Sequence, residues 1–107
     1  MSGPVREHLP TTIVRVRFLG PIRRHIDARE TQLELKAPVS VRSVLDALIE
    51  RHGEHLRSLF YNQYGWMDPR LWVLIDGVSA GAKGGLDAPI TGAEDIEIVL
   101  GQPISGG

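Results

Sequence analysis

Cysteine is absent from this 107-residue sequence, and lysine occurs only as Lys36 and Lys83. Without cysteine the chain has no disulfide bond, no cysteine-ligated zinc and no thiol nucleophile. Any sulfur chemistry must therefore use sulfur that another molecule supplies. The two lysines also limit the positions at which this chain can accept an amine-linked modifier.

The sequence also lacks an excess of either charge and any long apolar run. Its formal net charge is −1 and its pI is about 6.4, so there is no positive field to attract nucleic acid or an anionic membrane. No segment approaches the roughly 20 apolar residues that span a bilayer, and the first residues lack a signal peptide's apolar run. We therefore expect one cytoplasmic domain with no nucleic acid and no membrane among its partners.

Alternation predicts two strands near the start of the chain. Residues 12–19 alternate valine and phenylalanine with arginine, and residues 31–36 alternate again after a short connection, which indicates an antiparallel hairpin. Residues 22–26 suggest a single helical turn between the two strands. Residues 1–11 have no periodicity, and we expect them to be a flexible leader.

A helix is predicted after Pro38. Ser40 is suited to cap the first turn, and Gly53 is suited to end the helix. Between them, apolar residues recur at three- and four-residue spacing. Leu56, Leu59 and Phe60 suggest another helical turn, and residues 62–69 are turn-rich and aromatic. No conformation is predicted for residues 54–70 as a whole.

Two further strands complete the predicted fold. Residues 71–75 are apolar and β-prone, which is typical of a central strand, and Asp76-Gly77 after them is a hairpin signal. Residues 95–100 alternate again and lead directly into the last residues of the chain. This order predicts an α+β roll, in which a mixed sheet of about four to five strands packs on one main helix.

The last residues of the chain, 101–107, have no apolar periodicity and end in Gly106-Gly107. We expect them to project from a domain at residues 12–100 as a flexible arm that fits a narrow channel and leaves the last carbonyl open to attack. A carboxylate needs activation before acyl transfer, and ATP can supply it as a mixed anhydride with AMP. The glycine-rich segment 81–85 lacks the spacing of a phosphate-binding loop, so the activating enzyme must be a separate protein. A linker remnant or a frayed end is the alternative interpretation.

Several short motifs occur in the order typical of a known family: Val73-Leu74-Ile75-Asp76-Gly77, Gly84-Gly85-Leu86-Asp87, Gly92-Ala93-Glu94-Asp95 and Pro103 to Gly107. From about Val14 to Gly107 the chain resembles the MoaD/ThiS family of β-grasp sulfur carriers, which includes the small subunit of molybdopterin synthase. The resemblance implies a ubiquitin-like β-grasp fold. Two departures concern the partners: Gly101-Gln102-Pro103 replaces Pro-Pro or Leu-Pro before the tail, and the segment 61–70 is longer and more aromatic than in compact relatives.

The resemblance also implies a chemical role for the tail. An E1-like enzyme would use ATP to adenylate Gly107, and a sulfur donor would then convert it to a thiocarboxylate. An acceptor synthase or large subunit would bind the tail through Pro103, Ile104, Ser105 and Gly106. The chain would bind no cofactor itself, and would be a protein co-substrate or the small subunit of a synthase.

Several alternatives stay open at this level. The pathway that receives the sulfur stays open between molybdopterin, cysteine, thiamine or another biosynthesis. A ubiquitin-like modifier, conjugated to lysines through the same Gly107, requires identical chemistry up to the adenylate. A β-grasp interaction module, in which the tail has no role, is the third alternative.

Four other residue groups have both a functional and a structural interpretation. His52 and His55 are close in sequence, but no second cluster completes a coordination shell, so we expect no metal site. Asp46 and Glu50 are more typical of a solvated helix face than of a catalytic pair. Four arginines form either a basic patch or ordinary outward-facing charge: Arg15, Arg17, Arg23 and Arg24. Five aromatic residues belong either to a docking surface or to the core: Phe60, Tyr61, Tyr64, Trp66 and Trp72.

Overall fold

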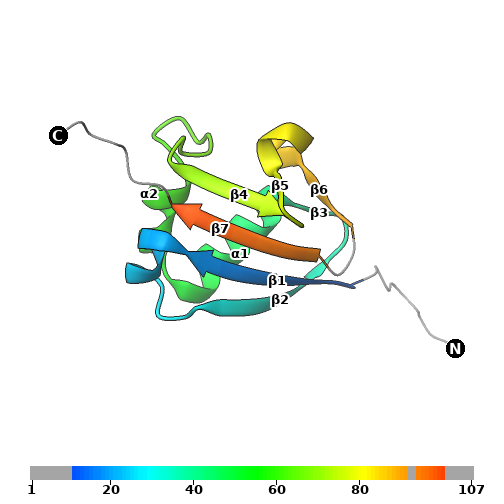
Figure 1. The fold of residues 1–107 in the computed structure, drawn as a ribbon, viewed down its shortest axis with the longest axis horizontal. Coiled ribbons are helices and arrows are strands. Elements are labelled where there is room, and N and C mark those ends of the chain that lie inside the picture. Colours follow the sequence, from blue (N-terminus) through cyan, green and yellow to red (C-terminus); the bar gives the residue numbers. More distant parts are fainter. Residues whose placement is uncertain (1–10, 92–93, 101–107) are drawn as a thin grey trace, which may run out of the picture.

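The computed structural model describes residues 11–91 and 94–100, in which a mixed five-stranded sheet packs on one 12-residue helix (Figure 1). The strand order is β2-β1-β7-β4-β5. Only β1 and β7 are parallel neighbours, and the other pairs are antiparallel. This confirms the predicted α+β roll. The sheet consists of β1 (Thr11–Leu19), β2 (Glu30–Lys36), β4 (Leu71–Ile75), β5 (Val78–Ser79) and β7 (Glu94–Leu100).

The first hairpin forms as the alternation predicts. Val14, Val16 and Phe18 are at most 1% exposed, whereas the arginines between them face outward. Strand β1 begins at Thr11, one residue before the expected start, and pairs antiparallel with β2. The connection contains a 3-10 helix, Gly20–Arg24, slightly earlier than the predicted turn.

Helix α1 (Val41–His52) has the predicted signals at both ends. The Ser43 amide donates to the Ser40 hydroxyl over 3.3 Å, and the Ser40 amide donates to the Ser43 hydroxyl over 3.1 Å. This reciprocal capping box satisfies two backbone donors that would otherwise lack partners. Gly53 ends the helix with a φ of +135°, where a Cβ would also meet the His55 ring at 2.6 Å.

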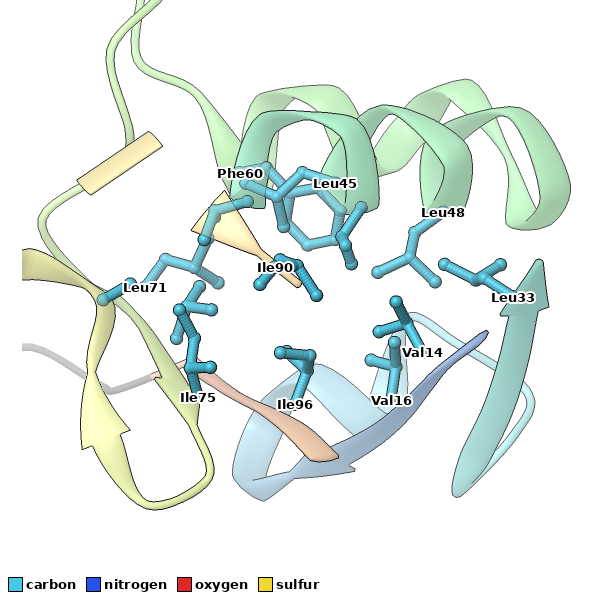
Figure 2. Close-up of a cluster of buried hydrophobic side chains, with 14 of the residues drawn as sticks. Val14, Val16, Leu33, Leu45, Leu48, Phe60, Leu71, Ile75, Ile90 and Ile96 are labelled. Atoms are coloured by element: carbon cyan, nitrogen blue, oxygen red, sulfur yellow. The ribbon is translucent and has the colours of Figure 1, made fainter. Parts of the chain in front are cut away.

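The hydrophobic core lies between α1 and the sheet (Figure 2). Helix α1 and a following turn of helix enclose one side of it. This turn comprises a 3-10 helix (Glu54–Leu56) and α2 (Arg57–Phe60), and both Leu56 and Phe60 are fully buried. Burial of these side chains removes apolar surface from water and stabilises the packing of the helix on the sheet. The buried residues contributed by α1 are Val41, Val44, Leu45, Leu48 and Ile49.

The second half of the sheet begins with β4, which has β7 on one side and β5 on the other, as expected for a central strand. Trp72 points away from α1 and stays 59% exposed. Asp76 and Gly77 both have positive φ, 50° and 86°, which matches the two central residues of a type I′ hairpin turn.

A smaller pair of strands was not predicted. Strand β3 (Val39–Ser40) pairs antiparallel with β6 (Pro89–Ile90), after two 3-10 helices at Ala80–Lys83 and Gly85–Asp87. Two residues are too few to give an alternating pattern, so the sequence carries no signal for this pair. Among the described residues, no helix has the length and apolar composition needed to cross a membrane.

Candidate functional site

The candidate site begins where β7 ends. Strand β7 is paired on both sides, with Ile96 between Val16 of β1 and Ile75 of β4. Leu100, its last residue, is paired with Leu71, the first residue of β4. Pairing on both sides fixes the point from which the chain continues toward residues 101–107.

The predicted site residues themselves lie outside the described part of the chain. They are the reacting Gly107 and the partner-binding residues Pro103, Ile104, Ser105 and Gly106. The predicted leader, residues 1–11, also lies outside it except for Thr11, which belongs to β1. The described geometry therefore concerns the surface around the end of β7.

A ten-residue loop, Tyr61–Arg70, adjoins this end of the sheet, and we call it the aromatic loop. The loop leads directly into Leu71, which is paired with Leu100. The start of β4 and the end of β7 thus lie at the same end of the sheet, on the left in Figure 1. One of the two segments that depart from the MoaD/ThiS pattern therefore lies beside the end of β7.

The tip of the aromatic loop is held by Asn62. Its side-chain oxygen accepts hydrogen bonds from the amides of Tyr64 (2.8 Å) and Trp66 (3.0 Å). Its own amide donates to the Trp66 carbonyl over 2.7 Å, and the Gly65 amide donates to the Asn62 carbonyl over 3.0 Å. Asn62 was not among the residues predicted from the sequence, although an asparagine side chain that accepts from the amide two residues further on is a known turn signal.

The base of the aromatic loop is held by Asp68. Its amide donates to the Phe60 carbonyl over 2.8 Å, and its carbonyl accepts from the Leu71 amide over 2.9 Å. Its carboxylate accepts from the Arg70 amide (2.8 Å) and guanidinium (3.0 Å). The hydrogen bonds from Arg70 lower the pKa of Asp68.

Of the aromatic residues considered for a docking surface, some belong to the core and others are exposed. Phe60 belongs to the core, whereas Tyr64, Trp66 and Trp72 are 74%, 71% and 59% exposed. Tyr61 is intermediate: it is half-buried and donates to the Asp46 carboxylate over 2.7 Å. Burial, with this hydrogen bond as a second cause, raises the pKa of Tyr61.

An open groove of about 1030 Å³ runs between the two helices and the aromatic loop. Several of its charged groups already have partners. Asp46 accepts from Tyr61, and Arg57 pairs with Glu54. Arg42 lies 3.6 Å from Asp87. The groove is therefore a polar surface with internal charge compensation, lined among others by Arg42, Asp46, Arg57, Tyr61, Tyr64 and Asp68.

The two histidines considered as metal ligands make separate contacts. The His52 ring lies edge-on to Phe18, with 6.0 Å between ring centroids, and His55 Nε2 is 2.7 Å from the His25 carbonyl. His52 Nε2 is buried without a hydrogen-bond partner among the described residues. Burial, followed by the nearby charges of Arg51 and His55, lowers the pKa of His52. In residues 11–91 and 94–100, no three His, Cys, Asp or Glu side chains are close enough to hold a metal ion.

The four arginines considered as a basic patch are all exposed. Arg15 and Arg17 lie on the sheet face away from α1, whereas Arg23 and Arg24 belong to the first 3-10 helix. Arg17 forms an ion pair of 3.3 Å with Glu97 on β7, which compensates part of the charge on this face.

Comparison with known proteins identifies the fold. No protein-family model matches the sequence, and no curated protein matches it. Small archaeal modifier protein 1 from Methanosarcina acetivorans has a solution structure that matches with a TM-score of 0.73 and 20% identity, over 92% of this chain and 99% of that one.

Two further solved structures have related folds. CysO, in the crystal structure of the Amycolatopsis orientalis BexX/CysO complex, matches with a TM-score of 0.65 and 21% identity, over 88% of this chain and 99% of that one. A putative molybdopterin converting factor subunit 1 from Pyrococcus furiosus matches with a TM-score of 0.64 and 15% identity, over 85% and 99%. The chain therefore has the ubiquitin-like β-grasp fold of these proteins, as its resemblance to the MoaD/ThiS family implied.

Proposed function

We propose that this chain is a ubiquitin-like sulfur carrier, whose Gly107 is adenylated by a separate E1-like enzyme and then converted to a thiocarboxylate. One observation carries the proposal: the last strand of a β-grasp fold, paired on both sides, leads into a sequence that ends in Gly106-Gly107. The fold neighbours support the same general kind of protein, since they include CysO and a putative molybdopterin converting factor subunit.

The chemistry at Gly107 has two steps. A carboxylate oxygen attacks the α-phosphorus of ATP, so that pyrophosphate leaves and an acyl-adenylate forms. Hydrosulfide then attacks the carbonyl carbon, AMP leaves, and loss of a proton gives the thiocarboxylate. The carbonyl is accessible because glycine has no Cβ.

ATP belongs to the partner enzyme in this proposal. A phosphate-binding loop connects a strand to a helix and wraps the phosphates with its backbone amides. Here the glycine-rich segment instead folds into two short 3-10 helices, Ala80–Lys83 and Gly85–Asp87. This conformation supports the proposal that the activating enzyme is a separate protein. The reaction would take place in the cytoplasm, where ATP is supplied.

The acceptor of the sulfur is a synthase or large subunit in molybdopterin or cysteine biosynthesis. The putative converting factor subunit favours molybdopterin as the product. CysO, which forms a complex with BexX, supports a carrier that docks on a second protein. Residues 103–106 would occupy the channel of that protein and bring the thiocarboxylate to its active site.

A ubiquitin-like modifier is the second candidate function. The match to small archaeal modifier protein 1 favours it. The same acyl-adenylate would form, but a lysine amine on another protein would finally displace the activated group and give an isopeptide bond. Isopeptide-linked conjugates in cell extract, absent when Gly106 and Gly107 are deleted, distinguish the modifier from the sulfur carrier.

Intact-mass measurement tests the proposal. The full chain is incubated with an E1-like adenylating enzyme, ATP and a sulfide source. The expected result is a mass increase equal to replacing one oxygen with one sulfur, which maps to Gly107 and is lost when Gly106 and Gly107 are deleted. An unchanged mass with an enzyme that is active on its own carrier contradicts the proposal and favours the modifier or the interaction module.

A further inference from the structure

We infer that the aromatic loop is a docking element for the adenylating enzyme, with Trp66 and Tyr64 as its anchors; this inference rests on the proposed function. The two side chains are 71% and 74% exposed, although they are among the largest apolar side chains of the chain. Exposed tryptophan and tyrosine are the residue types that contribute most when they enter a partner's pocket.

The loop is organised before any partner binds. Asn62 accepts hydrogen bonds from the amides of both anchor residues, and Asp68 ties the base of the loop to Phe60 and Leu71. A loop whose backbone is already hydrogen-bonded loses little further conformational freedom on binding. These bonds leave both aromatic side chains in solvent, so the bonds present the anchors without burying them.

The position of the loop places it beside a protein that holds Gly107, which the adenylating enzyme must do. Residues 101–107 span at most about 25 Å when fully extended, so an enzyme that holds Gly107 in its active site must lie within that distance of Leu100. A standard interface buries about 800 Å² per partner, which corresponds to a disc with a radius of roughly 16 Å. A disc centred on Leu100 includes its pairing partner Leu71, and the aromatic loop leads directly into Leu71.

The charge of the loop defines the chemistry of the partner's surface. Its one acidic and one basic residue, Asp68 and Arg70, form an ion pair with each other at 3.0 Å. The outward surface at the tip is therefore aromatic rather than charged. The complementary surface is an apolar pocket with a polar rim, next to the channel that receives the tail.

The test compares full-length variants in ATP–pyrophosphate exchange catalysed by an E1-like enzyme that accepts the wild-type chain. We expect Trp66→Ala and Tyr64→Ala each to raise KM by about tenfold or more while kcat is unchanged, because docking contributes equally to the ground and transition states. Trp66→Phe restores part of the affinity. Asn62→Ala keeps both anchors but loosens the loop, so its KM rises by a smaller factor.

The control is Ile13→Ala, which removes an exposed apolar side chain (42%) on β1. Ile13 lies at the opposite end of the sheet, because β1 is parallel to β7 and Ile13 precedes the paired segment. Its KM stays within about twofold of the wild type. Circular dichroism and urea midpoints verify that all variants are folded.

The outcomes separate this inference from the proposed function. If the wild type supports exchange but Trp66→Ala and Tyr64→Ala keep the wild-type KM, the docking inference is wrong and the carrier proposal stands. If exchange is unchanged while sulfur transfer to the acceptor is impaired, the loop docks the acceptor and our assignment of the partner is overturned. If the wild type itself supports no exchange with any active E1-like enzyme, the proposed function fails first.

Discussion

Replacement of Ile96 by alanine tests the register of β7, on which the position of its last residue, Leu100, depends. Ile96 is 1% exposed and lies between Val16 and Ile75, which are both fully buried. In a strand, successive side chains point to opposite faces, so a shift of one residue would move Ile96 to the outer face of the sheet. The energetic effect of the substitution therefore depends on whether this register is correct.

The expected loss of stability follows from the atoms removed. The substitution deletes three carbons, each worth about 0.8 kcal/mol on burial, which gives about 2.4 kcal/mol. A cavity between α1 and the sheet adds to this, so we expect a total loss of about 3 to 4 kcal/mol. With a urea m-value of about 1.5 kcal/mol/M, the unfolding midpoint falls by about 2 to 2.7 M.

Far-UV circular dichroism in urea is the appropriate assay. Both tryptophans are more than half exposed, so their fluorescence reports the core poorly. Ile13→Ala is the matched control, because it is the same substitution on the outer face of the neighbouring strand, at a side chain that is 42% exposed. It should lower stability by no more than about 1 kcal/mol. Equal losses for both variants would refute the assigned register.

Three further predictions concern other features of the fold. Ser40→Ala removes the capping box with Ser43 and should lower the free energy of unfolding by about 1 kcal/mol in a thermal melt. Gly77→Ala places a Cβ at a φ of +86° and should destabilise by about 1 to 2 kcal/mol, whereas Gly81→Ala, at an ordinary φ, should change stability by less than about 0.5 kcal/mol. Because the pKa of His52 is lowered in the folded state, the unfolded state binds a proton more readily. The contribution of His52 to the free energy of unfolding is therefore present above about pH 6.5 and is lost as the pH falls below that value. Urea midpoints at about pH 7.5 and 5 should therefore differ more in the wild type than in His52→Gln; an equal difference contradicts the prediction.

Much of the fold was predictable because it depends on local patterns. The alternation of residues 12–19 correctly predicts that Val14, Val16 and Phe18 lie in the core, because one face of this strand is buried and the other is exposed. Ser40 begins α1 because its hydroxyl caps the first turn, and Gly53 ends α1 because glycine tolerates a positive φ. Both signals are local and can be recognised from residue type. Asp76-Gly77 gives its hairpin for the same reason.

The parts that were not predicted depend on interactions without periodicity. The pair of β3 and β6 contains two residues in each strand, and it forms because the surrounding chain brings them together. The aromatic loop depends on hydrogen bonds from backbone amides to the side chains of Asn62 and Asp68. Its aromatic composition was visible in the sequence, but only the structure separates buried Phe60 from exposed Trp66.

The position of the aromatic loop beside the end of β7 is a direct consequence of the sheet topology. Strands β4 and β7 are antiparallel neighbours, so the first residue of β4 and the last residue of β7 lie at the same end of the sheet. A change in the length or composition of residues 61–70 therefore alters the surface beside the end of β7 while β1, β4 and β7 keep their pairing. Because loops tolerate such changes better than paired strands, one β-grasp scaffold can present different surfaces at this end of the sheet.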